Sequence, residues 1–152
     1  MSKVKRFSIW FMIVLTISCA LLGCNGGKDY LNGHRWGETE NQTAGKGWDR
    51  TKFAGYEVQK VWTYHSEDGL YEVQYTFVVI DKDARDVYKQ LKKVLGNPDW
   101  SGNSVVGDPE YTWYQGTVSI EASLTEYQSD YANAHGERTV KVVVTIVNDK
   151  YR

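Results

Sequence analysis

Cysteine is almost absent from this chain of 152 residues, which has only Cys19 and Cys24. Both precede residue 25, so no disulfide bond can form within the rest of the chain. Small exported domains often depend on disulfides when their cores are too small to stabilise them. This chain is long enough to bury a substantial core instead. We therefore expect one domain that is stabilised by apolar packing alone.

Metal-ligating residues are also sparse. The three histidines are His34, His65 and His135, and none has a second ligand at the spacing of a zinc site. Asp83 and Asp86 belong to an acidic run that lacks the glycine and distal glutamate of an EF-hand loop. These acids are better explained as caps of a helix N-terminus. The sequence predicts no metal and no other cofactor.

Catalytic groups are equally hard to find. Residues 65–68 (HSED) contain the residue types of a hydrolytic site, but neighbours in a tight turn cannot converge as a triad must. Asp99, Asp108 and Glu110 lie near Trp100 and could flank a sugar as a glycosidase pair does. Such clusters arise easily among 19 acidic residues, so we expect a protein that is not an enzyme.

An excess of positive charge is lacking after the N-terminus. Three of the 18 basic residues lie in the first six positions, and all 19 acidic residues follow residue 28. Residues 24–152 therefore carry 18 − 3 = 15 basic and 19 acidic side chains, a net charge of −4. A mildly acidic domain lacks the basic patch that nucleic-acid binding requires, so we expect no nucleic-acid partner.

What the chain does contain begins with an export signal. Lys3, Lys5 and Arg6 precede an apolar run over residues 7–22. A basic start followed by an apolar stretch and a small residue is typical of a signal peptide. The basic residues favour retention of the N-terminus on the cytoplasmic side.

The motif Leu21-Leu22-Gly23-Cys24 resembles the lipobox of bacterial lipoproteins. The resemblance implies that diacylglycerol is attached to the Cys24 sulfur and that the chain is cut after Gly23, so that residues 1–23 are the signal peptide. Several acyl chains anchor a protein stably. Asn25, in place of aspartate, favours the outer membrane in a host with two membranes. We expect a lipid-anchored protein on the cell membrane or outer membrane that faces the periplasm or exterior; the alternative is an uncleaved membrane anchor.

Residues 24–53 follow the motif and are expected to form a flexible, Gly-rich tether. They contain six glycines and no apolar periodicity. Tyr30, Trp36 and Trp48 are unusual in a spacer and leave open a docking role.

Residues 54–152 are predicted to form a single α+β domain. Alternating apolar residues indicate about five strands. An Asp68-Gly69 turn joins the first two. A helix from Asp83 to Leu95 has an apolar stripe, and Gly96 and Pro98 end it. The elements follow the order β-β-α-β-β-β, which predicts a two-layer sandwich with one helix packed on an antiparallel sheet. The strands are expected over 56–65, 70–80, 111–114, 117–127 and 137–148.

A local motif resembles another lipoprotein family. Leu95-Gly96-Asn97-Pro98, followed by a strand that carries Trp113, is similar to the SmpA/OmlA lipoproteins of the outer-membrane barrel-assembly machinery. That family places two helices before its strands, whereas this chain places a hairpin before one helix. The resemblance implies a role in envelope assembly.

Aromatic residues give the clearest functional signal. Tyrosine and tryptophan are enriched in binding hot spots. The candidates near loops, Trp100, Tyr111, Tyr114, Tyr127 and Tyr131, are interpreted as a binding surface, with the covering of strand ends as the alternative.

Taken together, these features predict a lipid-anchored, non-catalytic binding or assembly module of the cell envelope. Its partners would be the membrane, through the lipid on Cys24, and an envelope protein that contacts the loops at 97–114 and 127–136. Two alternatives remain open. The first is an inhibitor or immunity lipoprotein that neutralises a toxin or hydrolase. The second is glycan or peptidoglycan binding through the loop aromatics.

Overall fold

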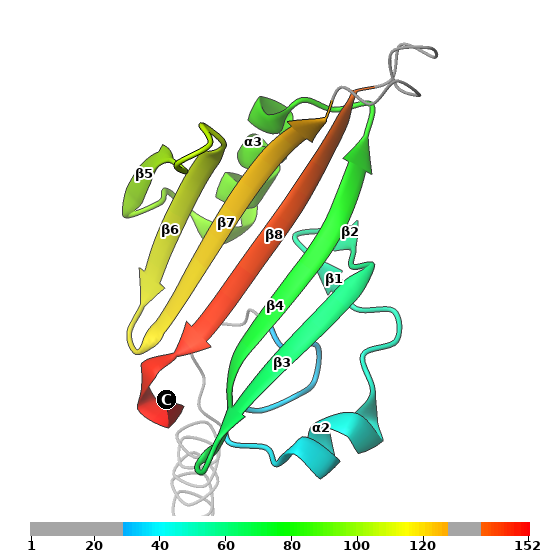
Figure 1. Ribbon diagram of the computed structural model, residues 1–152, viewed down its shortest axis with the longest axis vertical. Helices are drawn as coiled ribbons and strands as arrows, with labels where there is room; N and C mark the ends of the chain where they lie inside the picture. The colour runs from blue at the N-terminus through cyan, green and yellow to red at the C-terminus, as the bar shows by residue number, and fades with distance from the viewer. Residues whose placement is uncertain (1–28, 128–137) are drawn as a thin grey trace, which may run out of the picture. The chain divides into compact units, whose positions relative to one another are not determined.

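The central element of the fold is an antiparallel sheet of six strands (Figure 1). The computed structural model describes residues 29–127 and 138–152. The strand order is β3-β4-β8-β7-β6-β5, and every neighbouring pair is antiparallel. The bounds are Lys60–Ser66 (β3), Gly69–Ile80 (β4), Trp100–Asn103 (β5), Pro109–Gln115 (β6), Val118–Tyr127 (β7) and Thr139–Asn148 (β8).

One face of this sheet forms the core, because apolar residues alternate along its long strands. Val142 of β8 lies between Phe77 of β4 and Leu124 of β7, and all three side chains are completely buried. The same alternation continues along each of these strands, which confirms the inward faces expected for them. One apolar exception is Ile80, the last residue of β4, which is 57% exposed.

Helix α3 (Ala84–Leu95) packs on this core face and begins where the sequence predicts. The Asp83 side chain accepts a hydrogen bond from the backbone N–H of Asp86, which caps the first turn. The helix ends at Gly96, whose φ of 92° lies in the left-handed region that favours glycine. The indole Nε1 of Trp113 donates a hydrogen bond to the Gly96 carbonyl at 3.0 Å and so fixes the helix end to β6. No helix in the described part of the chain combines the length and apolar character needed to cross a membrane.

Residues 31–59, here called the N-terminal segment, also pack on the core face. They contain helix α2 (Glu40–Lys46) and a two-stranded sheet of β1 (Lys52–Phe53) and β2 (Tyr56–Glu57). The prediction of a flexible tether over residues 24–53 does not describe this part, because its side chains are buried in the same unit as the sheet. The buried side chains include Leu31, His34, Thr43, Thr51 and Phe53.

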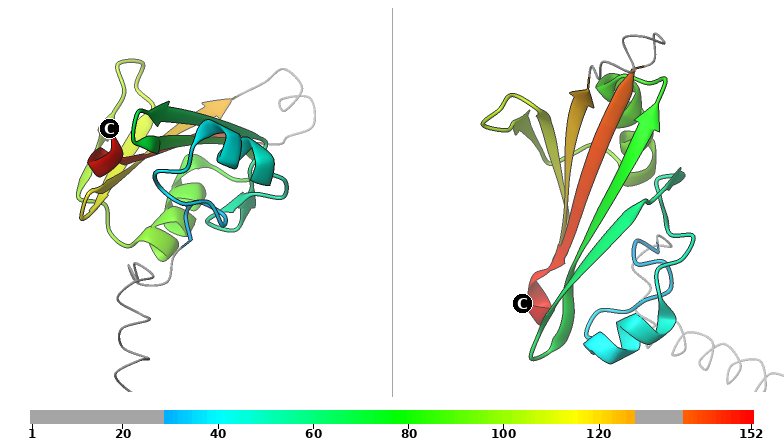
Figure 2. Two further views of the ribbon diagram at one scale, coloured as in Figure 1. Left: turned by 90° about the horizontal axis from the view of Figure 1, so that it is seen from below. Right: turned by 45° about the vertical axis from the view of Figure 1, so that its right-hand side comes forward.

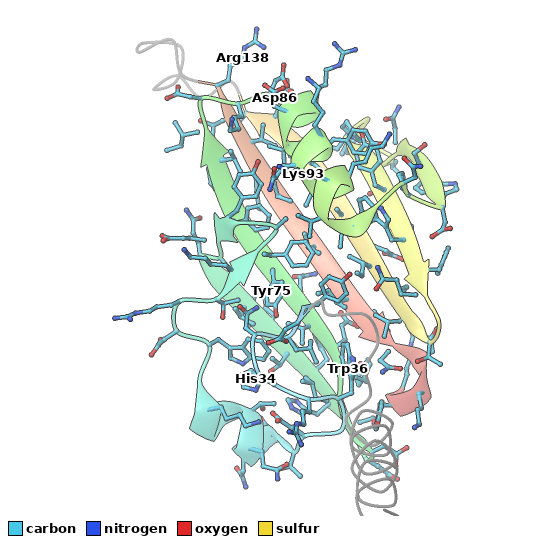
Figure 3. All side chains as sticks on the ribbon, turned by 180° about the vertical axis from the view of Figure 1, so that it is seen from behind. His34, Trp36, Tyr75, Asp86, Lys93 and Arg138 are labelled. Carbon is cyan, nitrogen blue, oxygen red and sulfur yellow. The ribbon has the colours of Figure 1, made fainter. Side chains whose placement is uncertain are left out.

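Aromatic contacts attach the N-terminal segment to β4. The ring of Trp48 meets Tyr75 edge-on with centroids 6.1 Å apart, and Phe53 lies 5.8 Å from the same ring. Tyr56 stacks on Phe77 at 5.4 Å. Figure 3 shows Tyr75 on the side of the sheet where α3 lies, with His34 near α2. The N-terminal segment therefore completes the core that α3 begins.

The α+β class and the antiparallel sheet are confirmed. The prediction of about five strands and one packed helix is wrong, because the structure has more of both. The described chain has six strands in the main sheet, a second sheet of two strands, and α2 in addition to α3. The extra main strand, β5, has the sequence WSGN, which predicts a loop because it lacks apolar alternation. Its pairing with β6 shows that contacts within the sheet can form a strand from residues that have little intrinsic preference for strand structure. The strand expected over 56–65 is divided into β2 and β3, and the pairing of β3 with β4 is interrupted by an irregularity between Tyr64 and His65.

Candidate functional site

The most distinctive surface is the face of the six-stranded sheet opposite α3, which we call the open face (Figure 2). Neither helix nor the β1–β2 sheet covers it, as Figure 1 also shows. Residues two apart on a strand share a face, so the open face consists of the positions that alternate with the buried ones. Its members include Lys60, Trp62, Tyr64, Glu72, Gln74, Trp100, Glu110, Thr112, Tyr114, Glu121, Ser123, Lys141 and Thr145.

The strand register arranges these side chains in rows across the sheet. One row takes a residue from each strand and has a tryptophan at both ends; it consists of Trp100, Thr112, Glu121, Thr145, Gln74 and Trp62. Within it, the Gln74 Nε2 donates a hydrogen bond to the Thr145 hydroxyl at 3.3 Å. A neighbouring row begins with Tyr114 and ends with Tyr64. The open face therefore has aromatic edges and a polar centre.

Part of the predicted binding surface lies on this face. Trp100, Tyr114 and Tyr127 occupy outward positions and are 48%, 63% and 46% exposed. The structure thus brings three of the five predicted residues to one side of the sheet. Tyr131 lies outside the described residues.

Tyr111 is on the opposite face and does not share this surface. Its ring stacks on Tyr88 of α3 with centroids 4.2 Å apart and planes inclined by 14°. Burial raises the pKa of the Tyr111 hydroxyl, and the neighbouring Tyr88 adds to the rise. Tyr111 therefore helps to seat α3 on the sheet, which is a structural role different from the expected covering of strand ends.

Sequence reasoning missed Trp62 and Tyr64, which are 49% and 43% exposed on the open face. Their alternation in β3 was recognised, but period two does not distinguish the inner face from the outer one. The relevant signal was the neighbouring strand, because Val61 pairs with the buried Tyr75 and must share its face.

A concavity of about 300 Å³ lies at the β5 side of the open face. Trp100 forms one side of it, and the carboxylate-bearing residues Glu110 and Glu121 also line it. Hydroxyl groups are supplied by Thr112, Ser123 and Thr145. An exposed indole beside carboxylates and hydroxyls is suited to non-covalent recognition.

Two carboxylate-bearing residues, Glu72 and Glu121, lie toward the centre of the open face. Burial raises the pKa of Glu72; the Arg152 guanidinium opposes this rise and the Glu121 carboxylate adds to it. Glu72 and Glu121 are therefore close enough for like-charge repulsion.

Other candidate sites have structural roles. The Ser66 hydroxyl donates to the Tyr151 carbonyl, while the His65 ring lies 3.1 Å from the Thr43 hydroxyl, so residues 65–68 do not converge on one point. Asp83 caps α3, as expected. Within residues 29–127 and 138–152, no three metal-ligating side chains form a group that could hold a metal ion.

The three acids considered for sugar chemistry are also separated by their contacts. Asp99 accepts a hydrogen bond from the backbone N–H of Tyr114 at 2.7 Å, and Asp108 accepts one from the Thr125 hydroxyl at 2.6 Å. Of the three, Glu110 alone lines the concavity.

Gly23 and Cys24 lie outside the described residues, so the cleavage and lipidation sites remain predictions.

The chain was compared with known proteins at the level of families, sequences and structures. No family model, curated protein or solved structure matches it.

Proposed function

We propose that this chain is a lipid-anchored, non-catalytic binding module of the cell envelope, and that an envelope protein docks on its open face. The observation that carries the proposal is the set of exposed aromatics that border this face. Five large rings, of Trp62, Tyr64, Trp100, Tyr114 and Tyr127, are each between 43% and 63% exposed on one side of one sheet. Exposed aromatic residues gathered on one surface mark interaction sites.

The lipid attachment in this proposal rests on the lipobox motif that ends at Cys24. Membrane attachment restricts the search for a partner to the envelope and raises its local concentration there. A second candidate function, neutralisation of a basic toxin or hydrolase, is favoured by the carboxylates Glu72, Glu110 and Glu121 on the same face. Both functions use one surface and differ in the partner.

The test is a crosslinked pull-down from the envelope of the producing cells, with the tagged full-length chain as bait and mass spectrometry as readout. We expect one dominant protein that is captured less by the W62A/Y64A and W100A/Y114A variants. The matched control is Lys93→Ala, which changes an exposed residue of α3 on the other side of the sheet. Capture that is unaffected by both aromatic double variants would refute docking on the open face.

Cys24→Ala separates the anchor from the binding surface. Mass spectrometry of the native chain should detect acyl chains on an N-terminal Cys24, and the variant should lose both this modification and the cleavage after Gly23. A native chain without lipid would refute the anchoring part of the proposal and leave the docking part to be judged on its own variants.

A further inference from the structure

The concavity on the open face is shaped by an unusual contact between Trp100 and Gly102. A Cβ atom added at Gly102 would lie 2.5 Å from two atoms of the Trp100 indole, so the ring lies directly over the glycine. The residue that Trp100 faces on β6, Thr112, is only 7% exposed. Glycine in a strand often marks such a close approach. The absence of a side chain at Gly102 therefore allows the Trp100 ring to occupy this position at the edge of the concavity.

The charges around this ring all have one sign. Glu110 and Glu121 line the concavity, and its other lining residues include no lysine or arginine. Glu110 is opposite Gly102 on β6, so its side chain stands beside the indole. Two carboxylates next to the π face of an indole form an environment that stabilises an organic cation.

Trp62, at the opposite edge of the open face, can be compared with Trp100. There the ammonium group of Lys60 lies 4.4 Å from the centroid of the Trp62 ring. Trp100 occupies the corresponding end of the same row, but in the described part of the chain no cation lies over its ring. Trp100 is thus the tryptophan of this row that is open to a cation from outside.

We propose that the concavity receives a lysine or arginine side chain presented by the partner protein, between the Trp100 ring and the carboxylates of Glu110 and Glu121. This inference rests on the proposed docking function and names the group that the open face recognises. A neutral sugar is the weaker candidate, because it would remove water from two carboxylates without neutralising them. The hydroxyls of Thr112 and Ser123 complete the polar lining.

The test uses the full-length chain in detergent micelles with ¹⁵N-labelled tryptophan. Each indole N–H gives a separate NMR signal, and Trp100→Phe identifies the signal of Trp100. The probes are capped pentapeptides, Gly-Gly-Lys-Gly-Gly and Gly-Gly-Arg-Gly-Gly, with norleucine in the central position as an uncharged control and chitotriose as a neutral sugar. We expect the Lys or Arg peptide to shift the Trp100 signal, but not that of the buried Trp113.

Two variants make the test specific. The combined change E110Q/E121Q keeps the side-chain shapes and should weaken the binding of the cationic peptide about tenfold. Gly102→Ala removes no binding group, and its φ is not in the left-handed region, but it must displace the Trp100 ring and should weaken binding as well. A shift caused by chitotriose and not by the cationic peptides would overturn the proposal, as would binding that both variants leave unchanged.

The pull-down distinguishes failure of this inference from failure of the proposed function. A partner that is lost from W100A/Y114A but retained by E110Q/E121Q would preserve docking on the open face and refute the recognition of a cation. A partner that is retained by all open-face variants would refute both.

Discussion

At the scale of single residues, the best-defined polar cluster lies in the N-terminal segment around His34. Its Nδ1 lies 3.0 Å from the Glu38 carboxylate and its Nε2 lies 2.8 Å from the Gly47 carbonyl. Its ring also stacks on Trp48 with centroids 3.8 Å apart. Glu38 accepts a further hydrogen bond from the Lys46 ammonium. A buried imidazole and carboxylate are thus satisfied by each other and by their neighbours.

The Glu38 carboxylate makes stability sensitive to acid. Burial alone would raise its pKa, but the hydrogen bonds from Lys46 and His34 outweigh burial, and the pKa is lowered. A carboxylate with a lowered folded-state pKa contributes stability above its unfolded pKa, and this contribution is lost as pH falls through the folded value. We therefore expect the free energy of unfolding to fall below about pH 4.5.

Glu38→Gln should lower stability at pH 7 by about 1–3 kcal/mol, because a charged acceptor is lost from a buried site. It should also flatten the acid limb of the pH profile. Urea denaturation between pH 3 and pH 7 measures both effects. Parallel profiles for the native chain and the variant would show that Glu38 does not cause the acid sensitivity.

At the scale of elements, the N-terminal segment is joined to the β3–β4 hairpin by backbone contacts. The Gly37 N–H donates to the Leu70 carbonyl, and the Leu70 N–H donates to the Glu38 carbonyl, at 3.0 and 2.8 Å. Gly69 lies at this junction with a φ of 101°, and a Cβ atom there would be 2.3 Å from the Gly37 carbonyl oxygen. The glycine that the sequence assigns to the hairpin turn also admits another piece of backbone.

Gly69→Ala should therefore destabilise the protein by about 2 kcal/mol or more, because backbone strain and a backbone clash act together. Gly116→Ala is the matched control: its φ is 65°, but nothing lies within 4 Å of an added Cβ. The control should lose only the strain contribution, about 1–2 kcal/mol. Chemical denaturation of the two variants measures the difference. Equal losses would mean that the Gly37 contact adds nothing.

The elements that could be predicted from sequence are those with long periodic patterns. β4, β7, β8 and α3 each repeat apolar residues over ten or more positions, so their type and buried face follow from local spacing. β5 has four residues and no such pattern. In the candidate site, Trp100 and Tyr114 were found by residue type, whereas their alignment with Trp62 depends on a register that only the assembled sheet defines.

The N-terminal segment is packed although its glycine content predicts a flexible chain. Several glycines instead occupy turns with positive φ, including Gly33 (88°), Gly37 (80°) and Gly47 (69°). These turns let a few side chains reach the core without any regular apolar period. One local signal was present: Thr39 and Gln42 form the capping box that begins α2.

At the scale of the whole molecule, the packed N-terminal segment changes the expected mode of anchoring. The unit that contains the sheet begins at Leu31, so only residues 25–30 separate it from Cys24. A chain of this length spans at most about 25 Å. If Cys24 carries the lipid, as proposed, the binding module works within that covalent reach of the membrane and cannot sample the long range of a tether that extends to residue 53.

A deletion series tests whether the N-terminal segment belongs to the domain. A chain that begins at Asp29 keeps every residue of the unit that starts at Leu31 and should unfold cooperatively in urea. A chain that begins at Ala54 loses Leu31, Trp48 and Phe53, and so uncovers Tyr75. Burying one large apolar side chain contributes about 1.5–3 kcal/mol, and a domain has only about 5–15 kcal/mol in total.

The chain that begins at Ala54 should therefore lose most of its stability, bind the hydrophobic dye ANS and unfold without a sharp transition. Loss of the near-UV circular dichroism signal, together with dye fluorescence, distinguishes this state from a native fold. If the chain that begins at Ala54 unfolds as cooperatively and at the same urea concentration as the one that begins at Asp29, the aromatic contacts to Tyr75 contribute little. Residues 31–53 would then act as the tether that their composition suggests, and the open face could operate far from its lipid.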